Sequence, residues 1–548
     1  MVLLTVMSCR TLEEYNISPN QVPVGDAQPY DLMDELICNG ALNVQQRFYD
    51  TIAELMQYTC VTSSSNEVCH RYYFAPSYVN NMWNNFAKWA ANADHMIVLA
   101  RDKKQPNYEA IGLTLRALWM DMLSCTFGRV PFSEAFKLRE LDQNKPKFDS
   151  EADIYAQLIT DLEYANTIYN TGITLPNVVK DKLYQGDVSK WRKFTNSLCM
   201  RLLMRLSNRS TEMEVIWGES VAAKLKKILD NPGEYPIFDS IYDNACVYFS
   251  GESPFQNNWG GYVESTLSGH RGAENFIDLL NGKVDPRKWI WFQPWSSSIQ
   301  WMGVRSGMPG DETQAAGYPV MDFEMFLSYK LPVSFMNYDE VLFIEAEARY
   351  RTDNDDWKAI SGNESQVRSA YNRAIEASCD FWRYIYNQYL GLKGRFNTNS
   401  SYNYRNFAAV EDTTITFTDG TLKGTDMTYY AVISDAAVQE FINNSVPFDM
   451  KTGLECILNQ KYVANFRVGL ESWNDYRRTG FPRLTIGTGT LNNGVLPRRL
   501  IYPTTTKTTN PDNYQLMLNE LAATYYDGKD DMLTPVWWSE AGLSMEIR

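Results

Sequence analysis

Apolar residues recur at helical spacing through most of the first 210 positions. In the stretch 108–125 the recurring residues are Ile111, Leu115, Leu118 and Met122. This spacing places them on one face of an α-helix. Similar patterns predict further helices over about 44–60, 79–102, 151–169 and 188–208. Because only short polar breaks separate them, we expect stacked helical hairpins of the tetratricopeptide kind, although no strict repeat of about 34 residues is present.

The pattern changes between about 235 and 335, where Gly, Pro, Ser and aromatic residues dominate. This composition predicts a loop-rich lobe with short strands, the part of a helical frame where ligand contacts are usually built. Helical spacing resumes over about 338–351, 364–390 and 433–444, and in the stripe Leu454, Leu458, Tyr462 and Phe466. We expect one shared core, so that residues 31–548 form a single domain whose helical scaffold covers about 31–230 and 336–480.

The first residues have the character of a bacterial lipoprotein signal. An apolar run from Met1 ends at Ser8 and Cys9, and polar residues follow. The run is short and no basic stretch precedes it, so we interpret residues 1–9 as a truncated signal remnant in which Cys9 is the lipidated position. Residues 10–30 contain several prolines, which predicts a flexible tether. The alternative is an ordinary apolar segment in which Cys9 occurs by chance.

Composition and charge exclude several partner classes. The formal net charge is −15 and no long basic run is present, so nucleic acid is not an expected partner. After Ser8 no stretch approaches the roughly 18 apolar residues of a membrane helix, so we expect membrane attachment only through an N-terminal lipid. Aromatic residues make up 14% of the chain, more than a core needs, and some should lie at the surface, where flat rings suit sugar faces.

Sequence motifs of the common enzyme classes are missing. No Gly-x-Ser-x-Gly elbow, Walker loop or dinucleotide fingerprint occurs. Glu345 and Glu347 stand two positions apart on a predicted helix, so their side chains diverge, which favours structural ion pairs over a hydrolase carboxylate pair. Glu67 and His70 form only half of a metal-binding pattern, and we interpret Arg477 and Arg478 as a buried clamp. We therefore expect no enzymatic activity, no metal and no cofactor.

Aromatic residues gather in two further places. Four tryptophans occur within thirteen positions of the lobe, namely Trp289, Trp291, Trp295 and Trp301. Trp289 and Trp291 alternate with Ile290 and Phe292 as in a strand, so packing against the helices is an equal alternative to ligand contact for these two. The second place is a proline-containing loop with Tyr72, Tyr73 and Tyr78. Such a loop cannot easily bury three rings, so we expect one or two of them to face a ligand.

Four stretches, in order along the chain, resemble the SusD/RagB family. The first is a helix over 113–126 that runs into Phe127-Gly-Arg-Val-Pro-Phe132, and the second is Tyr184-Gln-Gly-Asp-Val-Ser-Lys-Trp-Arg-Lys-Phe-Thr-Asn-Ser-Leu198, with Thr195 where that family usually has Ala. The third is Tyr338–Arg349, with its Glu-Ala-Glu-Ala core. The fourth and most specific is Gln460–Leu484, followed by Leu496-Pro-Arg-Arg-Leu-Ile-Tyr-Pro503 and Trp537-Trp538.

The resemblance implies a mainly α fold, with a right-handed scaffold of tetratricopeptide-like helix pairs and a loop-rich variable lobe. It implies a lipid-anchored protein on the cell surface of an outer membrane, which binds oligosaccharides and delivers them to a SusC-like, TonB-dependent transporter. It also implies that Trp295 and Trp301 contribute ligand-facing rings. The alternatives are capture of a peptide or glycopeptide for the same kind of transporter, a surface glycoside hydrolase, and a helical scaffold for protein partners only.

Overall fold

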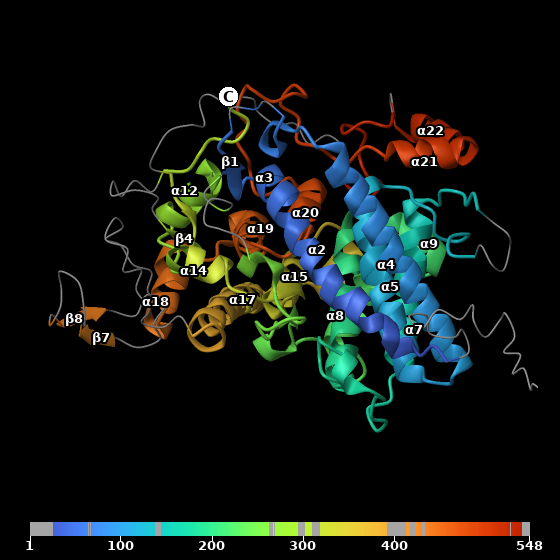
Figure 1. Cartoon of the computed structure of the whole chain (residues 1–548), viewed down its shortest axis with the longest axis horizontal. Coiled ribbons are helices and arrows are strands. Elements are labelled where there is room, and N and C mark those ends of the chain that lie inside the picture. The colour runs from blue at the N-terminus through green and yellow to red at the C-terminus, as the bar shows by residue number, and fades with distance from the viewer. Residues whose placement is uncertain are drawn as a thin grey trace, which may run out of the picture.

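Helices dominate the computed structural model, as predicted, and its strands are short (Figure 1). The structure describes residues 26–63, 65, 67–137, 144–261, 267, 269–293, 302–309, 318–391, 413–416, 424, 426–429, 433–525 and 528–539. Its longer helices are α4 (Pro76–Asp102), α5 (Pro106–Phe127), α7 (Glu151–Ile168), α8 (Val188–Arg205), α15 (Tyr338–Tyr350), α17 (Glu364–Tyr384), α19 (Gly453–Ala464) and α22 (Pro511–Thr524). The shorter ones are α2 (Gly40–Arg47), α3 (Ala53–Leu55), α9 (Ser210–Trp217), α10 (Val221–Asp230), α12 (Glu274–Gly282), α13 (Lys288–Trp291), α14 (Phe323–Phe326), α16 (Asp355–Ile360), α18 (Asp435–Glu440), α20 (Glu471–Thr479) and α21 (Thr504–Thr509).

The long helices pack as neighbours in sequence order. α4 and α5 form a hairpin, α5 packs on α7, and α7 packs on α8, while α15 packs on α17 and α19 (Figure 1). Local sequence sets where these helices begin. Pro76 and Pro106 stand at the first helical positions of α4 and α5, where a missing N–H costs nothing. The Asp187 side chain accepts a hydrogen bond from the Lys190 N–H and caps α8.

One predicted helix has different limits from those expected. The stretch predicted over 44–60 begins earlier, because π-helical turns at Glu35–Asn39 and Phe48–Ile52 extend α2 on both sides. It ends at Leu55, and Thr59–Val61 forms strand β1. The helix ends before residue 60 because of a tertiary contact. β1 pairs with strand β3 (His270–Gly272), more than two hundred residues away in sequence.

The region between 235 and 335 is loop-rich with short strands, as expected. β1, β3, β5 (Val320–Met321) and β4 (Phe292–Gln293) form one antiparallel sheet in that order. β2 (Ala245–Val247) pairs with β6 (Val333–Met336), and β7 (Thr413–Thr416) pairs with β8 (Asp426–Tyr429) outside the region. Residues Lys288–Trp291 form the helical turn α13, so the strand-like alternation around Trp291 is misleading.

A single apolar cluster runs through the molecule from Met33 to Trp538 and includes residues on both sides of the lobe. The described cysteines are all free thiols, and most of them are buried. Among the described residues, no helix combines the length and apolar character needed to cross a bilayer.

Buried ion pairs join four helices at the centre of this core. Arg201 of α8 binds Glu340 of α15 through two hydrogen bonds of 2.8 and 2.5 Å. Arg205, one turn later, pairs with Asp121 of α5 and, at 2.6 Å, with Glu471 of α20. Burial alone would raise the pKa of Glu471, but Arg205 and Arg201 outweigh it and lower the pKa to about 2. We call this set the central ion network.

A neighbouring group extends the central ion network through α15 and α20. Arg478 binds Glu347 at 2.8 Å and Asp475 at 2.9 Å. Glu345, by contrast, points to Arg349 at 2.8 Å. The expectations of a buried clamp at Arg477 and Arg478 and of diverging glutamates are both confirmed, because both arginines are fully buried and the two glutamates bind different partners.

The chain returns to α5 and α8 near Trp537 and Trp538. The guanidinium groups of Arg205 and Arg477 lie 5.5 and 4.9 Å from the Trp538 ring, which is fully buried. Arg209 donates a 2.6 Å hydrogen bond to the Trp537 carbonyl. The two tryptophans therefore cover the outer side of the central ion network.

Candidate ligand-binding site

Three loop segments that are distant in sequence meet beside β1 and form one face of the molecule. They are 68–78, 302–309 and 485–494, and we call this surface the three-loop face. His70 Nδ1 accepts a 3.1 Å hydrogen bond from the Gly307 N–H. Arg71 donates through Nε to the Gly489 carbonyl at 2.5 Å, and the Arg71 carbonyl accepts from the Leu491 N–H at 2.9 Å. These bonds fix the first loop against the other two.

Glycines allow two of these segments to approach closely. Gly307 has φ of +76°, a conformation that L side chains rarely adopt. A Cβ on Gly487 would lie 2.8 Å from the Gly307 carbonyl atoms, closer than van der Waals contact permits. The Gly487 N–H donates to the Ser306 carbonyl at 2.8 Å. The backbones of the second and third loops are therefore in direct contact.

Two of the predicted ligand-facing rings lie in the core, and these expectations are corrected. Trp291 is 0% exposed and lies among Phe276, Trp382 and Phe466, with ring centroids 5.0 to 6.1 Å away. Tyr72 is 1% exposed. In both cases neighbours from distant parts of the chain enclose the ring, so neither presents a face to a ligand.

The other predicted rings remain candidates. Tyr73 and Tyr78 are half-buried, and both belong to the first segment of the three-loop face, Tyr73 before α4 and Tyr78 in the first turn of α4. The Arg47 guanidinium lies 5.2 Å from the Tyr78 ring centre and orients that ring. Trp295 and Trp301 lie outside the described residues, as does Cys9. Met302, the residue after Trp301, is 57% exposed at the start of the second loop.

A buried cluster of titratable groups lies beneath the three-loop face. Glu54 accepts a 3.1 Å hydrogen bond from the His70 N–H and lies 3.9 Å from His270 Nδ1. Burial raises the pKa of Glu54 to about 8 and lowers the pKa of His270 to about 3. Burial, with Arg71 nearby, also lowers the pKa of His70 to about 4. At neutral pH these three groups are uncharged, while the Arg71 guanidinium of the same segment supplies a positive charge that is bound to the Gly489 carbonyl.

Sequence reasoning did not identify Glu54 and His270 as members of this cluster. They lie 216 positions apart and no local motif contains both, so only the pairing of β1 with β3 brings them together. In the part of the chain that the structure describes, no group of three or more His, Cys, Asp or Glu is arranged to hold a metal ion.

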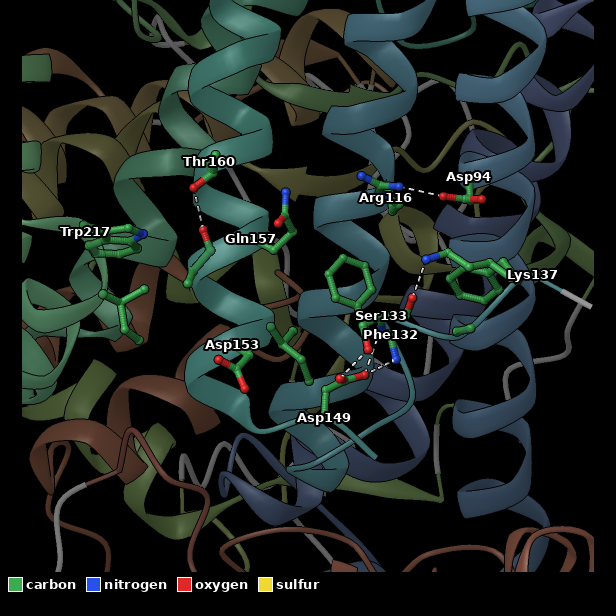
Figure 2. Close-up of a pocket in the computed structure, with 15 residues that line it drawn as sticks. Asp94, Arg116, Phe132, Ser133, Lys137, Asp149, Asp153, Gln157, Thr160 and Trp217 are labelled. Carbon is green, nitrogen blue, oxygen red and sulfur yellow. Dashed lines mark hydrogen bonds and ion pairs between the residues drawn. The ribbon is translucent and has the colours of Figure 1, made fainter. Parts of the chain in front are cut away.

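A separate groove of about 600 Å³ runs over α5 and α7 (Figure 2). Figure 2 shows Gln157 and Thr160 on α7, with Trp217 on one side of that helix and Phe132 on the other. Arg116 binds Asp94 of α4 at 2.6 Å and Asp161 of α7 at 2.7 Å. Because these charges are already paired within the protein, Arg116 acts as a clamp between three helices.

The buried carboxylate of Asp149 holds the loop that follows α5 and lines the groove. Asp149 accepts hydrogen bonds from the N–H groups of Phe132 and Ser133 at 2.9 and 2.8 Å, and from the Ser133 hydroxyl at 2.6 Å (Figure 2). These bonds fix the turn that follows Gly128, where α5 ends with φ of +85°. The groove is thus a well-ordered part of the helical frame.

Comparison with known proteins decides the family. The SusD-like family model, described as starch-binding and associating with the outer membrane, matches residues 19–503. The chain belongs to the SusD-like family. This is a family of outer-membrane-associated binding proteins rather than enzymes. No curated protein is significantly similar in sequence.

Solved structures share the SusD-like fold over nearly the whole chain. A chitin-binding protein is 21% identical, with a TM-score of 0.72 over 93% of this chain and 100% of its own. A chitin-binding SusD homologue from Flavobacterium johnsoniae is 19% identical, with a TM-score of 0.68 over 94% of this chain and 99% of its own. A SusD homologue from Bacteroides fragilis is 19% identical, with a TM-score of 0.68 over 93% and 99%. At these identities the likeness establishes the fold.

The residues that carry the SusD-like resemblance meet in the core. Asp121 belongs to the first motif, Glu340 lies in the third and Glu471 in the fourth, while Arg201 and Arg205 follow the second motif on the same helix, α8. All of them belong to the central ion network. The SusD-like motifs therefore meet in ion pairs between helices of the core.

Proposed function

We propose that this protein binds a neutral oligosaccharide at the three-loop face and delivers it to a SusC-like, TonB-dependent transporter in the outer membrane. The observation that carries the proposal is the three-loop face itself, where the half-buried Tyr73 and Tyr78 belong to the segment whose His70 N–H binds the buried carboxyl of Glu54. A pyranose stacks its C–H face on such rings, and its hydroxyl groups need no opposite charge. The family description and the chitin-binding neighbours support a glycan ligand.

Binding is tested by isothermal titration of the full chain with starch, chitin, cellulose and xylan oligosaccharides, alongside a mixed-peptide pool. We expect a glycan to bind, and Trp295→Ala, Trp301→Ala and the Tyr73→Ala/Tyr78→Ala variant to weaken its affinity about tenfold or more, because each stack contributes about 1 kcal/mol or more. Tyr164→Ala on α7 is the matched control. If only peptides bind, the ligand is a peptide and not a glycan. If all these variants keep the wild-type affinity, the three-loop face is not the binding site.

The lipid anchor and the transporter partner are separate parts of the proposal. We expect Cys9 to carry the lipid that holds the protein at the cell surface, and the protein to act without hydrolysing its ligand. Labelling with a radioactive fatty acid should mark the wild type and not Cys9→Ser. Mild detergent extraction of the outer membrane should co-purify a TonB-dependent barrel. Release of reducing sugar from the bound glycan would contradict a non-enzymatic role.

A further inference from the structure

A cleft of about 560 Å³ lies along α17, on a different set of elements from the three-loop face. Its floor is one face of α17, from which Arg373, Glu376, Asp380 and Tyr384 project at intervals of three and four residues. Tyr242 and Tyr338 line it from neighbouring segments, and Asp435 lines it from the start of α18. α17 and α18 are neighbours in Figure 1.

Tyrosine rings line the cleft on both sides. Tyr242 is 61% exposed, an unusual state for a large ring. Its ring meets Tyr384 edge to face, with centroids 5.7 Å apart and an interplanar angle of 79°. Tyr384 in turn contacts Tyr248 at 6.3 Å, so the exposed ring rests on a row of supported rings. The Tyr338 hydroxyl accepts a 3.1 Å hydrogen bond from Arg373, which fixes the opposite side.

The charged groups of the cleft are hydrogen-bonded within the protein, and its carboxylates remain accessible to solvent. Arg383 donates to Asp435 Oδ1 at 2.6 Å and also to Asp380 Oδ1. The side chains of Asp380 and Asp435 nevertheless stay 45% and 89% exposed. Glu376 accepts a 2.6 Å hydrogen bond from Gln439. With Arg373 and Arg383 beside Glu376, Asp380 and Asp435, the cleft offers several oriented donors and acceptors and an excess of carboxylates, which suits a ligand with many hydroxyl groups and disfavours an anion.

We propose that the α17 cleft is a second carbohydrate-binding site, in which Tyr242 stacks on a pyranose ring and Glu376, Asp380 and Asp435 accept hydrogen bonds from its hydroxyl groups. The cleft would hold a short stretch of a neutral glycan. The proposal rests on the proposed function in one respect, namely that the same polymer is the ligand of both sites. Two separate sites would bind a long chain more tightly than either alone, because the second contact becomes intramolecular.

The test is calorimetric stoichiometry with the full chain and hexasaccharides of starch, chitin, cellulose and xylan. We expect two hexasaccharides per chain in the wild type, and one in Tyr242→Ala. The Tyr73→Ala/Tyr78→Ala variant should keep the site at α17. Glu376→Gln, which preserves the shape of the side chain, should weaken the α17 site about tenfold by removing a charged acceptor. Tyr164→Ala, which removes another exposed ring, from α7, should change nothing.

The outcomes separate the two proposals. One hexasaccharide per chain that Tyr73→Ala/Tyr78→Ala removes and Tyr242→Ala does not would overturn the α17 site and leave the three-loop face. Binding that only Tyr242→Ala removes would support the α17 site and overturn the three-loop face. If no hexasaccharide binds, both sites are overturned. Because Tyr242 is exposed, its replacement should leave the Tm unchanged, which thermal unfolding checks.

Discussion

Glu54 is a neutral carboxylic acid at neutral pH because burial raises its pKa from 4.5 to about 8. An unfolded glutamate is ionised between these two pH values while the folded one is protonated, so folding takes up a proton there. The stability that the neutral group contributes is therefore complete below about pH 4.5 and is lost as the pH rises toward 8. The buried carboxyl makes the molecule sensitive to alkali.

Glu54→Gln tests this sensitivity. The amide keeps an oxygen that accepts from the His70 N–H but cannot ionise, so the free energy of unfolding should fall less between about pH 4.5 and 8 than in the wild type. Urea unfolding at several pH values measures this. Glu364→Gln, at an exposed ion pair with Arg368, is the control and should follow the wild type. Parallel pH profiles for Glu54→Gln and the wild type would contradict the assigned pKa.

Arg201 offers a second prediction for a single residue. Arg201→Met leaves the buried carboxylate of Glu340 without its main cation, so we expect a loss of about 3 to 5 kcal/mol in the free energy of unfolding. The matched control is Lys358→Met, whose ion pair with Asp355 is exposed to solvent and should contribute little. Chemical denaturation measures both. A loss below about 1 kcal/mol for Arg201→Met would show that the central ion network is not stabilising in the folded state.

At the scale of elements, the end of α5 depends on one glycine. Gly128 has φ of +85° and ψ of −121°, a combination that is costly for residues with a side chain. Gly128→Ala should therefore lower the free energy of unfolding by about 1 to 3 kcal/mol, although the added Cβ has room. Gly218→Asn is the control, because Gly218 ends α9 in the left-handed region that Asn tolerates. Equal effects of the two substitutions would contradict this explanation.

The sequence allowed most of the long helices to be predicted, because their apolar spacing is local information, whereas α22 and most of the short helices were not predicted. α4, α5, α7 and α8 begin and end within three residues of the predicted limits. The stretch ending in β1 was mispredicted, since its last residues pair with a strand far along the chain. The burial of Trp291 could not be predicted for the same reason. The rings that enclose it come from α12, α17 and the segment after α19.

The binding face was harder to predict than the fold. Its tyrosines could be named as candidates from the proline-containing loop, and the composition of the lobe indicated loops. The contact between Gly307 and Gly487, however, depends on two segments that no sequence pattern connects. The α17 cleft could not be recognised either, because Tyr242 and Asp435 approach α17 only in the folded chain.

At the scale of the whole molecule, the buried carboxylates of the central ion network predict acid sensitivity. Burial opposes ionisation of Glu347 and Glu471, but Arg478 at the first and Arg205 at the second outweigh it and lower each pKa to about 2. A depressed pKa stabilises the fold above the unfolded value of 4.5, and this stabilisation is lost as the pH falls toward 2. We expect the free energy of unfolding to decline steeply over that range. Tryptophan fluorescence during acid titration checks this, and a flat profile down to about pH 2 would contradict it.

The position of Trp537 and Trp538 over α5 and α8 has a consequence for the order in which the protein folds. Arg209 and Trp537 are separated by 328 residues, yet they are in contact. During synthesis the first helices leave the ribosome long before their cover exists, and contacts of such high sequence separation form slowly. The first half of the chain cannot complete its packing on its own. A nascent chain stopped before residue 538 would lack the ring that packs against the Arg205 guanidinium.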